Sequence, residues 1–312
     1  MKTVLRVVEP GLLTTIQDLG RPAAIAAGVP TGGAMDRFAH RAANLLAGNS
    51  PHEATLECTM SGPHLVAEAP CLVAITGADL QPRINGAPAP AWTSMFLGRG
   101  DRLSFDGRRS GARAYIAVGG GFEGDRWLGS RSTSLLAGRG GMHGRPLARG
   151  DELSIALDRS APAVAGRHLP HGLRPTYSDH DLHAIPGPHV RRLDAASRKL
   201  LFGAEFAVSH EADRMGYRLE GPQLSMSGDE LLSFGLVAGA VQVPRSGRPI
   251  LLMADYQTAG GYPVVAVVIS ASMPIAAQLS PGDAVRFIQT TATEASRRRL
   301  ALSSALATLS AP

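Results

Sequence analysis

The sequence predicts a mainly β fold that consists of two tandem β-barrel domains with a few short helices. Glycine (36 residues) and proline (22 residues) are abundant among the 312 residues, and aromatic residues make up only 5%. This composition favours many short elements joined by tight turns over long helices. Strand-like runs recur along the whole chain, and closing such strands into barrels removes exposed sheet edges. The length suits two domains.

One phrase occurs three times and predicts the strands that it contains. It reads GRGDRLSFD at 98–106, ARGDELSIA at 148–156 and SPGDAVRFI at 280–288, each a Gly-Asp turn followed by an alternating strand. We interpret these phrases as one type of hairpin used repeatedly. The runs VAITGADL (73–80) and AVVISASM (266–273), which precede the first and third phrases, are also similar. The chain therefore reads as two related halves.

Each half contains one segment with helical periodicity. Residues 35–47 place Phe38, Ala42 and Leu46 on one side of a helix, and residues 193–201 form the corresponding segment of the second half. Residues 158–179 are rich in Pro, Gly and His and have no period, so we interpret them as a linker. We therefore predict the following domains: an N-terminal barrel at 1–160, a C-terminal barrel at 175–290 and a helical tail at 291–312.

Charge and cysteine usage exclude several classes of protein. The net charge is +5, but Lys2 and Lys199 are the only lysines and no basic block has interleaved aromatic residues, which argues against nucleic-acid binding. No apolar run approaches about 18 residues, so we expect no membrane contact and a soluble, cytoplasmic protein. Cys58 and Cys71 lack CxxC spacing and read as buried thiols in a reducing compartment.

Several familiar motifs are absent or lack their required context. Gly119, Gly121 and Gly124 form a GxGxxG after a strand, but neither a helix nor an acidic residue follows as a dinucleotide site requires. There is no GxxxxGK[ST] for ATP phosphates and no GxSxG nucleophile turn. His180 and His183 have a spacing that suits a metal, but they lie where a solvated turn is commoner, so we predict no metal site.

The stretch at 240–263, AVQVPRSGRPILLMADYQTAGGYP, carries the strongest sign of a functional site. Two strand-like runs lead into Asp255, Gln257 and Thr258 and a Gly-Gly-Tyr-Pro turn, which suggests a backbone bent around a ligand. The alternative is a bulged barrel corner whose polar groups cap their own turn. In GSRSTS at 129–134, hydroxyls flank Arg131 and suit an oxyanion or phosphate, whereas the alternative is an Arg-Ser turn network.

We predict two groups of site residues within a wider polar set that also includes Gln17, Asp18 and Arg21. The catalytic group is Asp36, Asp255, Gln257 and Thr258. The substrate-binding group is Arg131, Ser132, Thr133, Asp213, Arg214, Arg218, Gln242 and Tyr262. Carboxylates serve to orient a substrate or as a general base, arginines bind carboxylate or phosphate, and amides and hydroxyls bond to an amide or carbonyl. Such a set suits a small polar amide.

Ordered phrases along the chain resemble one family. They include EPGLLTTIQDLGRP, GVPTGGAMD, LECTMSGP, LGSRSTS, DRMGYRL, VQVPRSGRPI and DYQTAGGYP, and together they extend from about Val4 to about Phe287. The chain closely resembles the allophanate hydrolase subunit 2 family, also called the biotin-dependent carboxyltransferase family. The resemblance implies that both barrels are cyclophilin-like.

The resemblance also implies a function within a complex. It implies the C subunit of an ATP-dependent 5-oxoprolinase, in which ATP activates the lactam carbonyl of 5-oxo-L-proline and water opens the ring to L-glutamate. The implied partners are a subunit 1 homologue (KipI-like, the B subunit of oxoprolinase) and the LamB/YcsF-type A subunit, and ATP is bound by the complex as a whole. Two alternatives stay open: a carboxyltransferase that uses carboxybiotin from separate carrier subunits, and a KipA-like regulatory binding protein without catalysis.

Three positions depart from the pattern of this family. Members usually read SEG and DRQTTGGYPK where this chain has Phe234, Tyr256 and Val264, so that one acidic and two basic side chains are replaced by apolar or aromatic ones. If the charged groups belong to a reaction site, their loss redirects or abolishes activity. If they form a surface ion network, their loss costs about 0 to 1 kcal/mol per pair.

Overall fold

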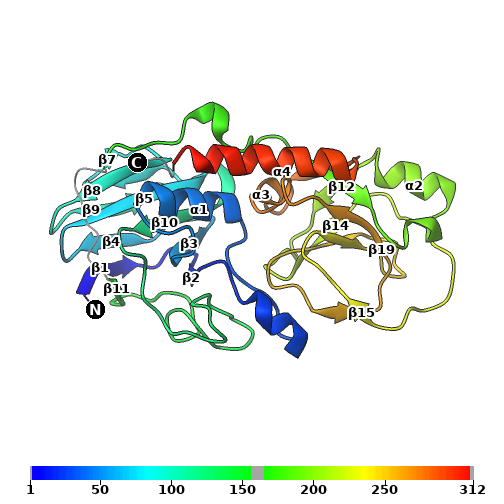
Figure 1. The fold of residues 1–312 in the computed structure, drawn as a ribbon, viewed down its shortest axis with the longest axis horizontal. Coiled ribbons are helices and arrows are strands. Elements are labelled where there is room, and N and C mark those ends of the chain that lie inside the picture. The colour runs from blue at the N-terminus through cyan, green and yellow to red at the C-terminus, as the bar shows by residue number, and fades with distance from the viewer. Residues whose placement is uncertain (1, 156–164, 310–312) are drawn as a thin grey trace. The chain divides into compact units, whose positions relative to one another are not determined.

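The structure, a computed structural model, describes residues 2–155 and 165–309 and divides into two compact units. Unit 1 contains Met1–Arg21, Gly32–Pro175 and Ser303–Pro312, and unit 2 contains Pro22–Thr31 and Thr176–Leu302. Both are built mainly from strands (Figure 1). The predicted mainly β fold of two barrel-like domains is thus confirmed, and residues 22–31 are an excursion of the N-terminal half that groups with unit 2.

Unit 1 consists of two antiparallel sheets and a helix, α1 (Arg37–Leu46). A six-stranded sheet has the order β11-β1-β4-β9-β6-β7 and a five-stranded sheet the order β2-β3-β10-β5-β8. The strands are β1 (Lys2–Glu9), β2 (Leu13–Gln17), β3 (Thr55–Thr59), β4 (His64–Ala67), β5 (Cys71–Asp79), β6 (Pro82–Ile84), β7 (Ala87–Pro88), β8 (Thr93–Leu97), β9 (Arg102–Phe105), β10 (Ser110–Val118) and β11 (Glu152–Ile155). A 3-10 turn, η3 (His171–Leu173), follows them.

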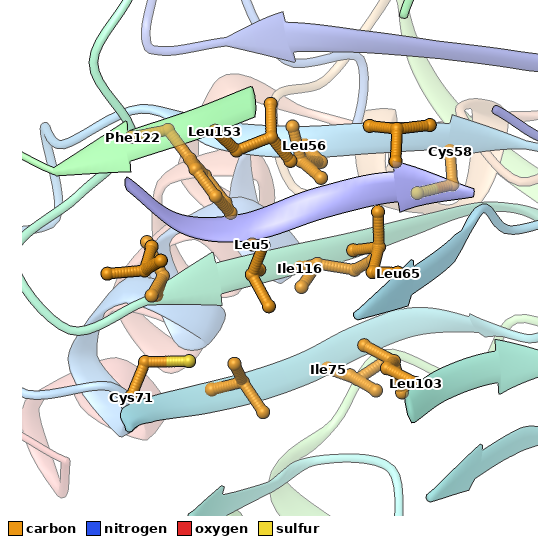
Figure 2. Close-up of a cluster of buried hydrophobic side chains, with 14 of the residues drawn as sticks. Leu5, Leu56, Cys58, Leu65, Cys71, Ile75, Leu103, Ile116, Phe122 and Leu153 are labelled. Carbon is orange, nitrogen blue, oxygen red and sulfur yellow. The ribbon is translucent and has the colours of Figure 1, made fainter. Parts of the chain in front are cut away.

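The two sheets of unit 1 enclose one apolar core. Leu5 from β1, Leu56 from β3 and Ile116 from β10 are fully buried in it (Figure 2). Cys58 and Cys71 are buried in the same core and form no disulfide. Burial raises the pKa of the Cys58 thiol to about 12, so this cysteine acts as a small apolar side chain.

Unit 2 is built around a closed barrel with the strand order β12-β19-β16-β17-β14-β13-β20. All pairs of adjacent strands in this barrel are antiparallel except the pair β12 and β20, which is parallel. The elements are η1 (Pro22–Ala27), β12 (Asp181–Pro186), η4 (Val190–Arg192), α2 (Ala195–Leu201), β13 (Glu205–Val208), β14 (Gly216–Glu220), β15 (Phe234–Gly235), β16 (Ala240–Gln242), β17 (Ile250–Leu252), β18 (Ala259–Gly260), β19 (Val264–Val268), α3 (Met273–Ala276) and β20 (Ala284–Gln289). The last helix, α4 (Ala292–Ala307), belongs to unit 2 up to Leu302 and to unit 1 from Ser303. Strands β15 and β18 form a separate two-stranded ribbon.

The helices begin and end near the positions that the sequence indicates. Asp36 caps α1 by accepting from Ala39 N at 2.9 Å, and Asp194 caps α2 by accepting from Ser197 N at 2.6 Å. An Asp at the N-cap satisfies one of the amide groups that the first turn leaves unbonded. No helix within the described ranges is long and apolar enough to cross a membrane. The predicted linker at 158–179 lies partly outside the described residues, and its residues 165–175 group with unit 1.

The three Gly-Asp phrases share one turn, which is not a hairpin. The carboxylates of Asp101, Asp151 and Asp283 accept from the amide three residues earlier at 2.7, 2.8 and 2.8 Å. The preceding glycine has a φ of about +90° in each turn and donates its N–H to a carbonyl of another strand or its end. The strand that follows the first turn, β9, pairs with β4 and β6, and the strand after the second turn, β11, pairs with β1. The strand after the third turn, β20, pairs with β12 and β13. The hairpin prediction was therefore wrong, because the turn starts a strand that pairs elsewhere.

Candidate functional site

Asp255 and Arg214 form a nearly buried ion pair in unit 2. Asp255 follows β17 and Arg214 precedes β14, the strand that pairs with β17. Arg214 donates from Nε to Oδ2 at 2.8 Å and from Nη2 to Oδ1 at 3.2 Å, and the Asp255 amide donates back to the Arg214 carbonyl at 2.8 Å. Only 9% of the arginine side chain and 20% of the aspartate side chain are exposed. This two-point contact fixes the direction of the carboxylate.

Two glutamine amides meet beside the turn between β18 and β19. The Gln242 side chain is buried and donates to the Tyr262 carbonyl at 3.2 Å. A Cβ atom at Gly260 would lie 2.7 Å from Gln257 Nε2 and 3.5 Å from Gln242 Nε2. A side chain at this position would therefore shift the end of the Gln257 side chain. The structure thus brings Gln242, Gln257 and Tyr262 to one corner of the barrel.

Thr258 lies next to this corner. Its carbonyl accepts from Leu236 N at 2.9 Å, which joins the two strands β15 and β18. A Cβ atom at Gly28, in the excursion of residues 22–31, would lie 4.0 Å from Thr258 Oγ1. The Tyr262 ring is 48% exposed and is accessible to a ligand.

Asp213 and Arg218 have other contacts. Asp213 Oδ1 accepts from the amides of Met215 and Gly216 at 2.8 and 3.1 Å, which shapes the turn before β14. Arg218 pairs with Glu211 at 2.7 Å, where the two side chains are 59% and 73% exposed. An exposed pair of this kind contributes about 0 to 1 kcal/mol to stability. The contacts that hold Asp213 and Arg218 are thus within the turn before β14 and with Glu211, and neither set includes Asp255.

The three positions that depart from the family pattern belong to one apolar cluster. Tyr256 and Val264 are each 4% exposed and pack with Leu236, Ala240 and Leu252, and Phe234 packs against the same cluster. We call this set of residues the Tyr256 cluster. A charged side chain at these positions of this chain would lie among apolar neighbours, and burying a charge in such surroundings costs several kcal/mol. The replacements therefore change the interior of this corner of the barrel.

His189 is a titratable residue at the Tyr256 cluster that the sequence did not single out. Its ring centroid lies 5.0 Å from that of Phe234, and its Nδ1 accepts from Val264 N at 3.1 Å. Burial, and then the positive charge of Arg192, lower the pKa of His189, so the neutral imidazole is favoured. The only signal in the sequence was that His189 directly follows a Pro-Gly-Pro at 186–188, at the end of a strand-like run.

A second polar cradle lies in unit 1 and is centred on Asp18. Its carboxylate accepts from Ser130 Oγ at 2.6 Å, Ser132 Oγ at 2.5 Å, Arg131 N at 2.7 Å and Gly20 N at 2.8 Å. Burial raises the pKa of Asp18, but the bonds from Ser130 and Ser132 and the two amides outweigh burial and lower the pKa below its ordinary value. The segments 17–21 and 129–134 are thus joined by one carboxylate.

The other groups of this cradle are also engaged within the protein. Arg131 donates from Nη2 to both oxygens of Glu123 at 2.7 and 2.6 Å, a partner that the sequence did not reveal. Thr133 Oγ1 donates to the Ile16 carbonyl at 3.0 Å, and Gln17 Nε2 donates to the Thr133 carbonyl at 3.2 Å. The arrangement matches the Arg-Ser turn network that the sequence left open as an alternative.

Asp36 belongs to a buried network at the start of α1. Its amide donates to Tyr115 Oη at 2.7 Å, and the Tyr115 hydroxyl donates to Glu57 Oε2 at 2.7 Å. Glu57 also accepts from Met35 N at 2.8 Å. Asp36, Tyr115 and Glu57 are 0%, 0% and 2% exposed, so a substrate reaches Asp36 only if this network opens.

His40 is fully buried in the next turn of the same helix. Its Nδ1 lies 2.9 Å from Thr55 Oγ1 and its Nε2 3.5 Å from Asn44 Nδ2, so both ring nitrogens face side chains. Burial lowers the pKa of His40 to about 3, which outweighs the opposing effect of the negative charge of Asp18. The imidazole is therefore neutral in the folded protein near neutral pH.

We expect the stability of the protein to fall below pH 6.5 because of His40. The unfolded imidazole takes up a proton near pH 6.5 and the folded one only near pH 3, so stability is full above pH 6.5 and is lost as the pH falls through that window. The contribution is at most about 1.4 kcal/mol per pH unit. Urea unfolding at pH 7, 6 and 5 measures it.

The matching variants separate titration from simple loss of packing. His40→Asn should flatten the slope between pH 7 and 5. Thr76→Val removes the 2.7 Å bond to the Ala39 carbonyl and should lower stability while it keeps the slope of the wild type. An unchanged slope in His40→Asn would show that other groups set the pH dependence.

No cluster of metal-binding side chains is present in the ranges 2–155 and 165–309. Asp181, which lies beside His180, instead pairs with Arg286 at 2.8 Å.

The comparisons with known proteins identify the family of this chain. A family model described as the carboxyltransferase domain, subdomains A and B, matches residues 27–289. The chain belongs to this carboxyltransferase domain family. Within the family it is 36% identical to the C subunit of the Escherichia coli 5-oxoprolinase over 297 residues, which cover 95% of this chain and 94% of that protein.

Other members of the carboxyltransferase domain family are parts of much longer proteins. The putative urea carboxylase of Emericella nidulans is 33% identical over 298 residues, 90% of this chain but 24% of that protein. The crystal structure of the Kluyveromyces lactis urea amidolyase matches with a TM-score of 0.93 at 26% identity and covers 99% of this chain and 20% of that one. The carboxyltransferase domain thus occurs both as a separate polypeptide and within larger enzymes.

Proposed function

We propose that this chain is the C subunit of an ATP-dependent 5-oxoprolinase, which hydrolyses 5-oxo-L-proline to L-glutamate together with partner subunits. The observation that carries the proposal is the match to the C subunit of the E. coli 5-oxoprolinase, which extends over 94% of that protein. The matches to urea carboxylase and urea amidolyase cover only 24% and 20% of those proteins. The proposed partners are a subunit 1 homologue of the KipI type and a LamB/YcsF-type subunit.

The polar corner of unit 2 supports a role in handling an amide. Gln242 and Gln257 place two carboxamides beside Gly260, and a carboxamide both donates to a carbonyl oxygen and accepts from an amide N–H. Asp255 is fixed by Arg214, which suits it to orient a substrate in one direction. We propose that these four residues, with Thr258, position the lactam.

The arginines of this chain offer little support for a nucleotide site. Arg131, which the sequence suggested together with Arg214 and Arg218 for carboxylate or phosphate binding, donates from Nη2 to both carboxylate oxygens of Glu123. A phosphate would have to displace that carboxylate and would meet its negative charge. We therefore propose that one of the partner subunits binds ATP, and we assign no step in this chain to the nucleotide.

Carboxyl transfer is the second candidate function, and the likeness to urea carboxylase favours it. In that case separate carrier subunits would supply carboxybiotin and the acceptor would be an amide nitrogen such as that of urea. Both candidate functions need a bound amide. In the first, water attacks the carbonyl carbon of the amide; in the second, the nitrogen of the amide takes the carboxyl group from carboxybiotin.

We expect the reconstituted complex to form glutamate. The chain would be co-expressed with a subunit 1 homologue and a LamB/YcsF-type subunit from the same genome, and glutamate would be measured with 5-oxo-L-proline in the presence and absence of ATP. Glutamate should form only when all three subunits and ATP are present. An intact complex that forms no glutamate but, with an added biotin carboxylase, a biotin carrier, bicarbonate and ATP, carboxylates urea would establish carboxyl transfer instead. A complex inactive in both assays would favour the KipA-like regulatory function.

A further inference from the structure

A pocket of about 620 Å³ lies in unit 2, where three loops meet η4. The loops are 223–231, 243–247 and 261–263, and Arg192 lines the pocket from the end of η4. This volume is within the range of about 300 to 1,000 Å³ that is typical of small-molecule sites. Nothing in the family match assigns a ligand to it, so its chemistry must be read from its walls.

Arg192 supplies an uncompensated positive charge to this pocket. Its side chain is partly buried and donates from Nη1 to the Asp229 carbonyl at 2.6 Å, which holds the guanidinium without neutralising it. Gly228 lies against it, since a Cβ atom there would be 3.3 Å from Cζ. Within the described residues no carboxylate pairs with Arg192, whereas the other arginine of the pocket, Arg245, pairs with Glu230 at 2.7 Å. A guanidinium held in this way is suited to bind a carboxylate at two points.

The ring of Tyr262 forms part of the pocket wall, and its hydroxyl is a second hydrogen-bond donor beside Arg192's guanidinium in the lining. Its carbonyl is bonded to Gln242, which ties the pocket to the amide corner, and its ring is 48% exposed and lines the pocket. In the part of the chain that the structure describes, the Tyr262 hydroxyl has no hydrogen-bond partner. An aromatic ring and a guanidinium that line one pocket offer a flat apolar surface for a small ring and a polar group for its substituent.

The charge of the remaining lining selects against a polyanion. Asp229 and Glu230 line the pocket together with Arg192 and Arg245, so the positive and negative side chains are equal in number. Arg245 and Glu230 compensate one another, which leaves Arg192 as the donor for one negative charge and Asp229 as a carboxylate that opposes any further negative charge. A nucleoside triphosphate would bring several negative charges against Asp229 and Glu230, which is unfavourable.

We propose that this pocket binds a small monocarboxylate, with Arg192 pairing with the carboxylate and the Tyr262 ring packing against the rest of the molecule. The inference rests on the proposed function to the extent that 5-oxo-L-proline, a ring with one carboxylate, is the expected ligand. Tyr262 lines the pocket and its carbonyl accepts from Gln242, so the pocket adjoins the amide corner, although Gln242, Gln257 and Asp255 are not among the residues that line it.

Calorimetric titration of the full chain tests this site. We expect 5-oxo-L-proline to bind saturably, 2-pyrrolidinone, which has the same ring without the carboxylate, to bind at least about 10-fold more weakly, and ATP not to compete. Arg192→Gln should weaken 5-oxo-L-proline binding about 10- to 100-fold, the loss expected for a hydrogen-bonded charge pair. Arg191→Gln is the matched control, because Arg191 is exposed and does not line the pocket, and its affinity should stay within about 2-fold of wild type.

A second variant guards against a failure of Arg192→Gln to fold. Tyr262→Ala removes an exposed ring, so the fold should persist, and binding should weaken about 10-fold. Equal affinity of 5-oxo-L-proline and 2-pyrrolidinone, unchanged affinity in both variants, or no saturable binding to the wild type would each overturn the proposal.

The assembled complex separates this inference from the proposed function. Glutamate formation with the same KM for 5-oxo-L-proline in wild type and Arg192→Gln would overturn the pocket assignment and leave the 5-oxoprolinase function standing. Arg192-dependent binding of 5-oxo-L-proline by the chain, in a complex that forms no glutamate, would retain the pocket and reject the reaction.

Discussion

Asp255→Ala is expected to lower the free energy of unfolding by about 2 to 4 kcal/mol and to reduce turnover of the assembled complex about 100-fold or more. The variant removes both oxygens that accept from Arg214, whose side chain is only 9% exposed. Removing one member of a largely buried ion pair deprives the other charge of that partner, and this costs more than the pair itself contributes. The loss of a group that positions a reacting substrate accounts for the fall in rate.

Two measurements keep these effects apart. Urea unfolding gives the change in stability, and turnover is then measured at a temperature at which circular dichroism shows the variant folded. Arg218→Ala is the matched control, because its ion pair with Glu211 is exposed, and it should change stability by less than about 1 kcal/mol. Unimpaired turnover of the folded Asp255→Ala complex would remove Asp255 from the reaction.

Local signals in the sequence predicted the strands and helices well and predicted their connections poorly. The Gly-Asp phrases located β9, β11 and β20, because an Asp that accepts from the amide three residues earlier and a glycine with positive φ are both local features. The hairpin interpretation failed because the partner of a strand is decided by distant carbonyls, such as Ala67, Val7 and Val208, that receive the glycine N–H groups. No short window contains that information.

The contrast between local signals and distant partners also explains which residues of the candidate site the sequence revealed. The stretch 240–263 contained Gln242, Gln257 and Tyr262, which the structure gathers at one turn. The cradle around Asp18 was visible only as two separate motifs, since its members are more than 110 residues apart. Glu123 and Arg192 carried no motif at all. Their importance arises from what lies beside them, a carboxylate against Arg131 and a pocket against Arg192.

The Tyr256 cluster explains why three substitutions are found together. Phe234, Tyr256 and Val264 come from separate segments, yet all three pack into one apolar set that includes Leu236 and Leu252. A single charged side chain in such a set would lack both water and a partner. The three side chains are therefore compatible with one another, and the effect on stability of a change at one position should depend on the residues at the other two.

Tyr256→Arg tests this dependence and is expected to lower the free energy of unfolding by about 3 to 5 kcal/mol. The variant removes an aromatic side chain that is 4% exposed and places a guanidinium among Leu236, Ala240, Leu252 and Val264. Loss of the ring and burial of the charge both oppose folding. Tyr256→Phe, which removes only the hydroxyl, is the matched control and should change stability by less than about 1.5 kcal/mol.

The double variant Phe234→Glu/Tyr256→Arg gives the sharper result. Phe234 packs against the same cluster, so a carboxylate there offers the guanidinium a partner. The combined loss should then be smaller than the sum of the two single losses by about 1 kcal/mol or more, measured as a double-mutant cycle in urea. Strict additivity would mean that the two positions are independent. A combined loss smaller than the sum would mean that positions 234 and 256 are coupled. An apolar side chain at one of them is then favoured by an apolar side chain at the other.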